Sequence, residues 1–147
     1  MKLFFGSLVA VVLLALHVYT IGVAVSVAGC VAAAGCQPTD FTPALAATMS
    51  LTGGLVSALV IAELAVTDPG TPPFKRALSQ GASAGRVKLV TAVAAIYLVA
   101  WLLGGLWAFV VGYLRHPGVV QPLTDLGQAW LGLAVAAGYS YFGIKRG

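Results

Sequence analysis

Residues 3–34 read LFFGSLVAVVLLALHVYTIGVAVSVAGCVAAA, an apolar run that contains no Asp, Glu, Lys or Arg. A helix that crosses the hydrocarbon core of a bilayer needs about 20 apolar residues, and this run is longer. It also exceeds the apolar core of about 7–15 residues in a cleaved signal peptide, although Val27–Cys30 looks like the cleavage box of a bacterial lipoprotein. We therefore expect a retained transmembrane helix here.

Three further apolar segments follow, each bounded by turn-forming or charged residues. The four predicted spans cover about 3–30, 43–66, 87–114 and 125–144, within one integral membrane domain of residues 1–147. A first-turn proline begins the second span, and Thr124-Asp125 is the predicted cap of the fourth. The loop 67–86 between the second and third spans contains a short predicted interfacial helix, Phe74–Gln80. The expected fold class is an all-α membrane protein, a bundle of four transmembrane helices.

The composition excludes several classes of protein. The chain has 147 residues, of which 60% are hydrophobic and 8% are charged, and its mean hydropathy is +0.99. A soluble domain carries about 25% charged residues, so this chain lacks the surface of a soluble enzyme or a nucleic-acid-binding protein. The net charge of +4 comes from basic residues at the ends of apolar segments, and we expect no nucleic acid as a partner.

The basic residues are distributed unevenly between the two predicted sides of the membrane. One side holds seven of them, and the other holds only Arg115; the seven are Lys2, Lys75, Arg76, Arg86, Lys88, Lys145 and Arg146. Basic residues collect on the cytoplasmic side of membrane proteins, so both termini are predicted to be cytoplasmic. We expect a multi-pass protein of a prokaryotic or phage-encoded inner (cytoplasmic) membrane.

Polar side chains inside the spans are candidates for function because burying them in lipid is costly. His17 lies halfway along the first span, where it lines a pore or relays protons, or else is a neutral imidazole that Thr52 or Tyr19 hydrogen-bonds. Glu63 lies near the cytoplasmic end of the second span, where it takes part in coupled transport or in an ion pair. A polar strip on the second span is formed by Ser50, Thr52 and Ser57.

Small residues recur inside the spans, where they allow helices to approach closely, within one chain or between copies. The predicted packing residues are Gly22, Ser26, Gly53, Gly54, Gly104, Gly105, Gly132 and Ala136. A large ring, from Trp101 or Trp107, is expected over the thin backbone of Gly104-Gly105. The Trp101 indole N–H is expected to face protein or a polar cavity rather than lipid.

Two groups near the predicted outer surface have alternative interpretations. Cys30 and Cys36 either form a disulfide on an oxidising face or are small buried apolar side chains. The polar side chains of the outer connections form either a metal or ion-pair site or a charge-paired rim; they are Asp40, Arg115, His116 and Asp125.

The sequence contains no nucleophile with a base and no metal-ligand set, so we expect no enzyme activity, no cofactor and no bound metal. The first interpretation is a small oligomeric pore or channel, either a holin-like lesion former or a small ion channel; its size and layout are similar to those of some phage holins. The alternative is a non-catalytic accessory or scaffold subunit of a larger membrane complex. The expected partners are the lipid bilayer and either further copies of the chain or that larger complex.

Overall fold

The computed structural model describes residues 2–66 and 84–142, and this part of the chain is helical throughout, without strands. Its elements are α1 (Lys2–Ala32), the 3₁₀ turn η1 (Pro38–Asp40), α2 (Pro43–Val66), α4 (Ala84–Phe109), the π-helix η2 (Val110–Arg115) and α5 (Gln121–Phe142). Most of loop 67–86, with the predicted interfacial helix Phe74–Gln80, lies outside the described residues. The all-α prediction is confirmed for the residues described.

Three of the long helices are apolar and long enough to cross a membrane. The apolar parts of these helices are Phe5–Ala32, Pro43–Ile61 and Ala92–Arg115. α5 is a long helix but is not one of these three, and its first turns carry polar Thr124, Asp125 and Gln128. The chain thus has the features of a multi-pass membrane protein, and the fourth crossing, through α5, stays a prediction.

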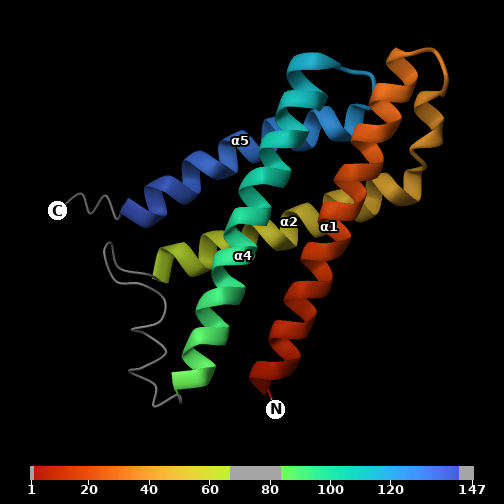
Figure 1. Cartoon of the computed structure of the whole chain (residues 1–147). Helices are drawn as coiled ribbons and strands as arrows, with labels where there is room; N and C mark the ends of the chain where they lie inside the picture. Colours follow the sequence, from red (N-terminus) through yellow and green to blue (C-terminus); the bar gives the residue numbers. More distant parts are fainter. Residues whose placement is uncertain (1, 67–83, 143–147) are drawn as a thin grey trace.

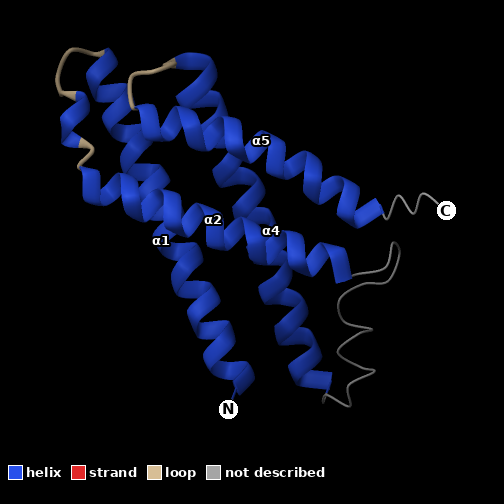
Figure 2. Cartoon of the chain, turned by 180° about the vertical axis from the view of Figure 1, so that it is seen from behind, coloured by secondary structure: helices blue, strands red, loops and turns tan. Residues whose placement is uncertain are grey.

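The helices form two hairpins that pair side by side. In Figure 1, α1 and α4 run in the same direction, and α2 and α5 return together at a slant, so the two connections gather at one end of the molecule. Contacts join α1 to α2, α4 to α5, α2 to α5 and α1 to α4. The view from behind in Figure 2 shows the same arrangement, with α1 and α4 as one layer and α2 and α5 as the other.

Two apolar clusters separated by a polar layer hold these helices together. One cluster lies toward the connections; it comprises Ile21, Ala24, Ala28, Phe41, Met49, Ala108, Val111, Val120 and Leu123. The other lies toward the opposite end and comprises Leu14, Val56, Val60, Tyr97, Trp101 and Ala137. Buried His17, Thr20 and Thr52 lie between the two clusters along their helices. This layer places three polar side chains inside the bundle, and the two threonines in it bond backbone carbonyl oxygens of their own helices.

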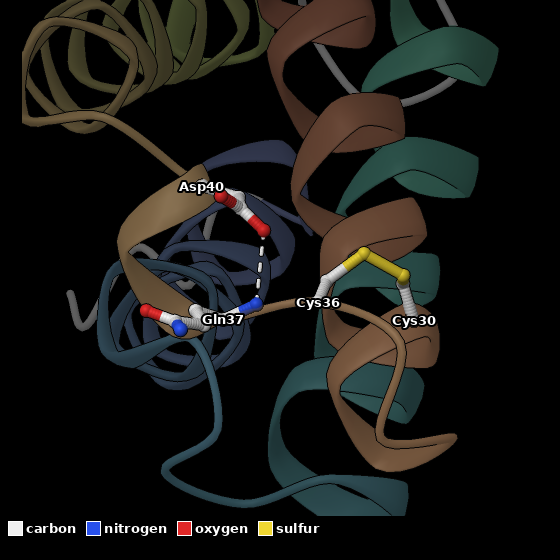
Figure 3. Close-up of a disulfide and its surroundings, with 4 residues drawn as sticks. All are labelled: Cys30, Cys36, Gln37 and Asp40. Carbon is white, nitrogen blue, oxygen red and sulfur yellow. Dashed lines mark hydrogen bonds between the residues drawn. A yellow bond between two sulfur atoms is a disulfide. The ribbon is translucent and has the colours of Figure 1, made fainter.

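The first hairpin is closed by a disulfide. Cys30, in the last turn of α1, is bonded to Cys36, and their Cα atoms are 5.3 Å apart. The chain then turns through η1, where the Asp40 carboxylate accepts a 2.9 Å hydrogen bond from the backbone N–H of Gln37 (Figure 3). Of the two interpretations of the cysteine pair, the structure has the disulfide.

The second hairpin is closed by a threonine, and here the predicted cap is wrong. α5 begins at Gln121, four residues before Asp125, where a helix capped by Thr124 would begin. The Thr124 hydroxyl instead donates a 2.6 Å hydrogen bond to the carbonyl oxygen of Gly112 in the π-helix and accepts one from the backbone N–H of Gly118 at 3.1 Å. In the π-helix a carbonyl pairs with the N–H five residues on, but for Gly112 that residue is Pro117, which has no N–H, and Thr124 satisfies this carbonyl.

Candidate functional site

The candidate site is a groove of about 460 Å³ between α2 and α5. Its wall residues follow helical spacing on each of these helices, and α1 and α4 provide its floor. The lining consists of His17, Ala46, Ala47, Ser50, Gly53, Gly54, Ser57, Trp101, Gly105, Pro122, Asp125, Leu126, Ala129, Trp130 and Leu133. The rim side chains of Ala47, Ser50, Asp125 and Ala129 are exposed. The groove therefore opens to whatever surrounds the chain, and its floor is buried.

His17 forms part of the floor at the level of the polar layer. Its side chain is 3% exposed, and its Nδ1 atom has no hydrogen-bond partner. A Cβ atom placed on Gly53 would lie 3.3 Å from His17 Cε1 and 3.7 Å from Nδ1, so glycine at this position makes room for the imidazole. An unsatisfied buried nitrogen is costly, which makes His17 the first residue to consider for binding.

The two expected partners of His17 are directed elsewhere. Thr52 is buried, and its hydroxyl donates to the backbone carbonyl oxygens of Thr48 and Met49 at 2.7 and 3.3 Å. Tyr19 is 63% exposed. The interpretation of a histidine hydrogen-bonded by either residue is therefore wrong for Nδ1, which has no partner.

Two tryptophans complete the floor. Trp101 is 1% exposed, and its indole N–H donates a 2.9 Å hydrogen bond to the Ser57 hydroxyl, as expected of a group that faces protein. The Trp130 ring lies over Gly105, where any Cβ atom would overlap the indole. The large ring over this glycine thus comes from α5, and the prediction of Trp101 or Trp107 is wrong. The centroids of the Trp101 and Trp130 rings are 6.0 Å apart, and Trp130 Nε1 has no hydrogen-bond partner.

Asp125 supplies a carboxylate to the groove from the beginning of α5. Its Oδ1 atom accepts a 2.8 Å hydrogen bond from the Gln121 side-chain amide, and the side chain is exposed. Asp125 therefore belongs to the groove, while Asp40 belongs to the η1 turn. In the part of the chain that the structure describes, no cluster of three metal-ligating side chains occurs.

The polar strip predicted on the second span divides between two faces. Ser50 and Ser57 line the groove, whereas Thr52 belongs to the buried layer behind it. Glu63 lies within α2, but its side chain lies outside what the structure describes. The structure therefore brings together Ser50, Ser57 and His17.

The predicted packing glycines also divide into two kinds. Gly53 lies tightly against the Leu126 and His17 side chains, and Gly105 lies tightly against the Trp130 ring. Gly104 is in ordinary contact with the Ile21 side chain. The other predicted glycines have open space where a Cβ would stand; they are Gly22, Gly54 and Gly132. Ala136 is exposed, and the Ser26 hydroxyl donates to the carbonyl oxygen of Gly22. These open positions remain available for contacts between copies.

Sequence reasoning missed two glycines with the closest backbone contacts. A Cβ atom on Gly112 would lie 2.8 Å from the Leu123 carbonyl oxygen, and one on Gly127 would lie 2.8 Å from Phe109 Cα. Gly105 and Gly112 are seven residues apart and so share one helix face. This spacing is the signal in the sequence that could have identified Gly112 as a packing residue. These contacts set the distance between α4 and α5 and thereby the position of Trp130.

A comparison with models of known protein families matches none of them, and comparisons with curated proteins and with solved structures likewise give no match.

Proposed function

We propose that this chain is a non-enzymatic membrane protein whose copies assemble into a small pore or channel, of the holin-like or small-ion-channel kind. The groove between α2 and α5 forms one wall of the path, and Ser50, Asp125 and His17 are among its polar groups. A groove that is open along one side encloses a path only when a second wall covers it. A second copy of the chain supplies that wall.

The observation that carries this proposal is the contrast between the groove and the helix faces around it. The exposed side chains of α1 and α4 include many large apolar residues, as suits contact with lipid; examples are Leu8, Val9, Val12, Ile96, Val99 and Leu103. The groove instead offers Ser50, Asp125 and the buried imidazole of His17. Polar groups left facing hydrocarbon cost several kcal/mol each. Covering the groove with another copy and water removes that cost.

The rims of the groove favour close approach of a second copy because their side chains are small. Ala47 and Gly54 on α2 and Ala129 on α5 are exposed, and Gly54 has open space around it. Gly132 and Ala136, one turn apart on α5, are the predicted contact between copies. Substitution of either by Leu is expected to cost about 1–2 kcal/mol per contact and to reduce the copy number. If both variants keep the wild-type copy number and stability, α5 does not form the interface between copies.

The proposal includes an orientation with both termini in the cytoplasm. Arg115 ends η2 and the Cys30–Cys36 disulfide lies at the end of α1, so both belong to the connection end, and an oxidising compartment favours a disulfide. In a chain with both cysteines changed to Ser, a cysteine introduced at exposed Thr39 is expected to react with an impermeant thiol reagent from outside intact cells. A fluorescent protein fused to the C-terminus is expected to fluoresce. Labelling from the cytoplasmic side only would show that the chain has the opposite orientation.

The decisive experiment combines a copy count in mild detergent with the release of graded dyes from liposomes. The wild-type protein is expected to be oligomeric and to release small dyes. Gly54→Trp places an indole in the groove and is expected to abolish release while the helix content stays unchanged. Gly6→Trp is the matched control because Gly6 is equally open but lies outside the groove. Normal release from the Gly54 variant would exclude the groove as the path.

The second candidate is a non-catalytic accessory or scaffold subunit, in which a helix of a larger membrane complex covers the groove. The same exposed small residues on α2 and α5 favour it, since they accept a foreign helix as well as a second copy. A strictly monomeric protein that releases no dye, together with a partner that protects a cysteine at Ala129 from labelling, is the result expected from this alternative.

A further inference from the structure

The groove has the charge pattern of a cation site. Among its described lining residues, Asp125 is the one with a formal charge, and none is Lys or Arg. Asp125 lies in the first turns of α5, at the connection end of the molecule, where its exposed carboxylate meets an approaching solute first. A carboxylate at the entrance of a low-dielectric cleft attracts cations and repels anions.

The floor of the groove adds two features that suit an organic cation. Trp101 and Trp130 bring two indole rings together there, and aromatic rings attract desolvated cations through their π faces. His17 lines the same floor next to Gly53 of α2; its side chain is only 3% exposed, and its Nδ1 has no hydrogen-bond partner. In the neutral tautomer that carries its proton on Nε2, the nitrogen that accepts a hydrogen bond is Nδ1. The N–H of an ammonium group is a donor that fits it.

We infer that the groove binds a small organic ammonium ion that carries at least one N–H. The cation enters past Asp125, and its ammonium group lies on the groove floor beside the indoles, where it donates to His17 Nδ1. A cavity of about 460 Å³ with mainly apolar lining accommodates a small amphipathic molecule. Passage of this cation through the membrane rests on the proposed function, but its binding to one chain does not.

The test measures binding to the whole chain in mild detergent, with tryptophan fluorescence and calorimetry as readouts. The probes are benzylammonium, benzyl alcohol and benzoate, which share a ring and differ in charge. Benzylammonium is expected to bind saturably and at least about tenfold more tightly than the other two, as a charge-selective cleft requires. Equal binding of all three probes would overturn the inference.

Two variants locate the cation. Asp125→Asn keeps the shape and the hydrogen bond from Gln121 but loses the charge, so benzylammonium is expected to bind about tenfold more weakly. Asp40→Asn is the matched control because Asp40 is an exposed carboxylate in η1, outside the groove, and wild-type binding is expected. Wild-type affinity in the Asp125 variant would contradict the inference.

His17→Phe keeps a flat ring on the floor but removes the acceptor. The wild-type chain is expected to prefer benzylammonium over benzyltrimethylammonium, which has no N–H, and the variant is expected to lose this preference while its helix content is unchanged. A preference that survives in the variant would exclude His17 as the acceptor. Cation binding without dye release would contradict only the pore, and dye release without cation binding would contradict only this inference.

Discussion

The two hairpins connect their helices by different means. The α1–α2 connection runs through residues 33–42, carries the Cys30–Cys36 disulfide and includes the η1 turn. The α4–α5 connection has only residues 116–120, and the elements on its two sides come into backbone contact at Gly112 in η2 and Gly127 in α5. A long connection tolerates movement and is restrained by a covalent bond, whereas a short one depends on close packing. The groove lies between one helix of each hairpin, so its width depends on both.

The largest expected effect is at the α4–α5 contact. Gly127→Leu would force a side chain against Phe109 Cα and the Ala108 carbonyl oxygen, which are backbone atoms and cannot move alone. Overpacking of this kind is expected to cost about 3 kcal/mol in the free energy of unfolding, measured by thermal unfolding in detergent. Gly132→Leu on the same helix has open space within the chain and serves as the control in a dilute, dissociated sample. Equal stability of the two variants would contradict the role of backbone contact.

Loss of the disulfide is expected to have the next largest effect. Replacing Cys30 and Cys36 by Ser frees a short loop and is expected to cost about 2 kcal/mol in the free energy of unfolding. The cost falls on the α1–α2 hairpin, so hydrogen exchange is expected to rise in residues 33–42 and to stay unchanged in 116–120. Wild-type protein treated with a reductant is expected to reproduce the variant. Faster exchange in the second connection instead would show that the hairpins are not independent.

The two connecting threonines offer a matched pair of smaller changes. Thr124→Val removes a buried hydroxyl that bonds Gly112 and Gly118, and a cost of about 1.5 kcal/mol is expected because both backbone groups lose their partner. Thr42→Val removes an exposed hydroxyl that accepts from Leu45 N–H at 3.3 Å, and about 0.5–1 kcal/mol is expected. Thermal unfolding of both variants measures the difference. A larger loss of stability in Thr42→Val than in Thr124→Val would mean that the α1–α2 connection is the more tightly packed of the two.

The smallest effect is expected from Gly53→Ala, on the α2 side of the groove. Its new Cβ would lie 3.0 Å from the Leu126 Cδ1 atom and 3.3 Å from His17 Cε1, which are side-chain atoms. The crowding is offset by the higher helix propensity of Ala, so the stability is expected to change by less than about 1 kcal/mol. A loss as large as that of Gly127→Leu would show that the groove floor is as rigid as the α4–α5 contact.

The amino-acid sequence determined the number and approximate limits of the long helices. Apolar runs bounded by charges and prolines predicted spans at 43–66 and 87–114, and the structure has α2 at Pro43–Val66 and α4 with η2 at Ala84–Arg115. These limits are readable because the length and hydropathy of a segment are local properties. The cap at Thr124 was misread because its hydroxyl bonds Gly112, which is distant in sequence.

The tertiary structure alone decided which polar residues meet. Ser50 and Ser57 are seven residues apart and share one face of α2, while Thr52 lies on another, as the helical repeat alone indicates. The packing of the helices decided that the serine face borders the groove and that the Thr52 face is buried. Likewise, Trp130 covers Gly105 only because Gly112 and Gly127 let α5 approach α4 so closely. Hydropathy places each residue at a depth in the membrane, but side-chain partners depend on how helices rotate and cross. Those angles are set by the packing of all the helices together.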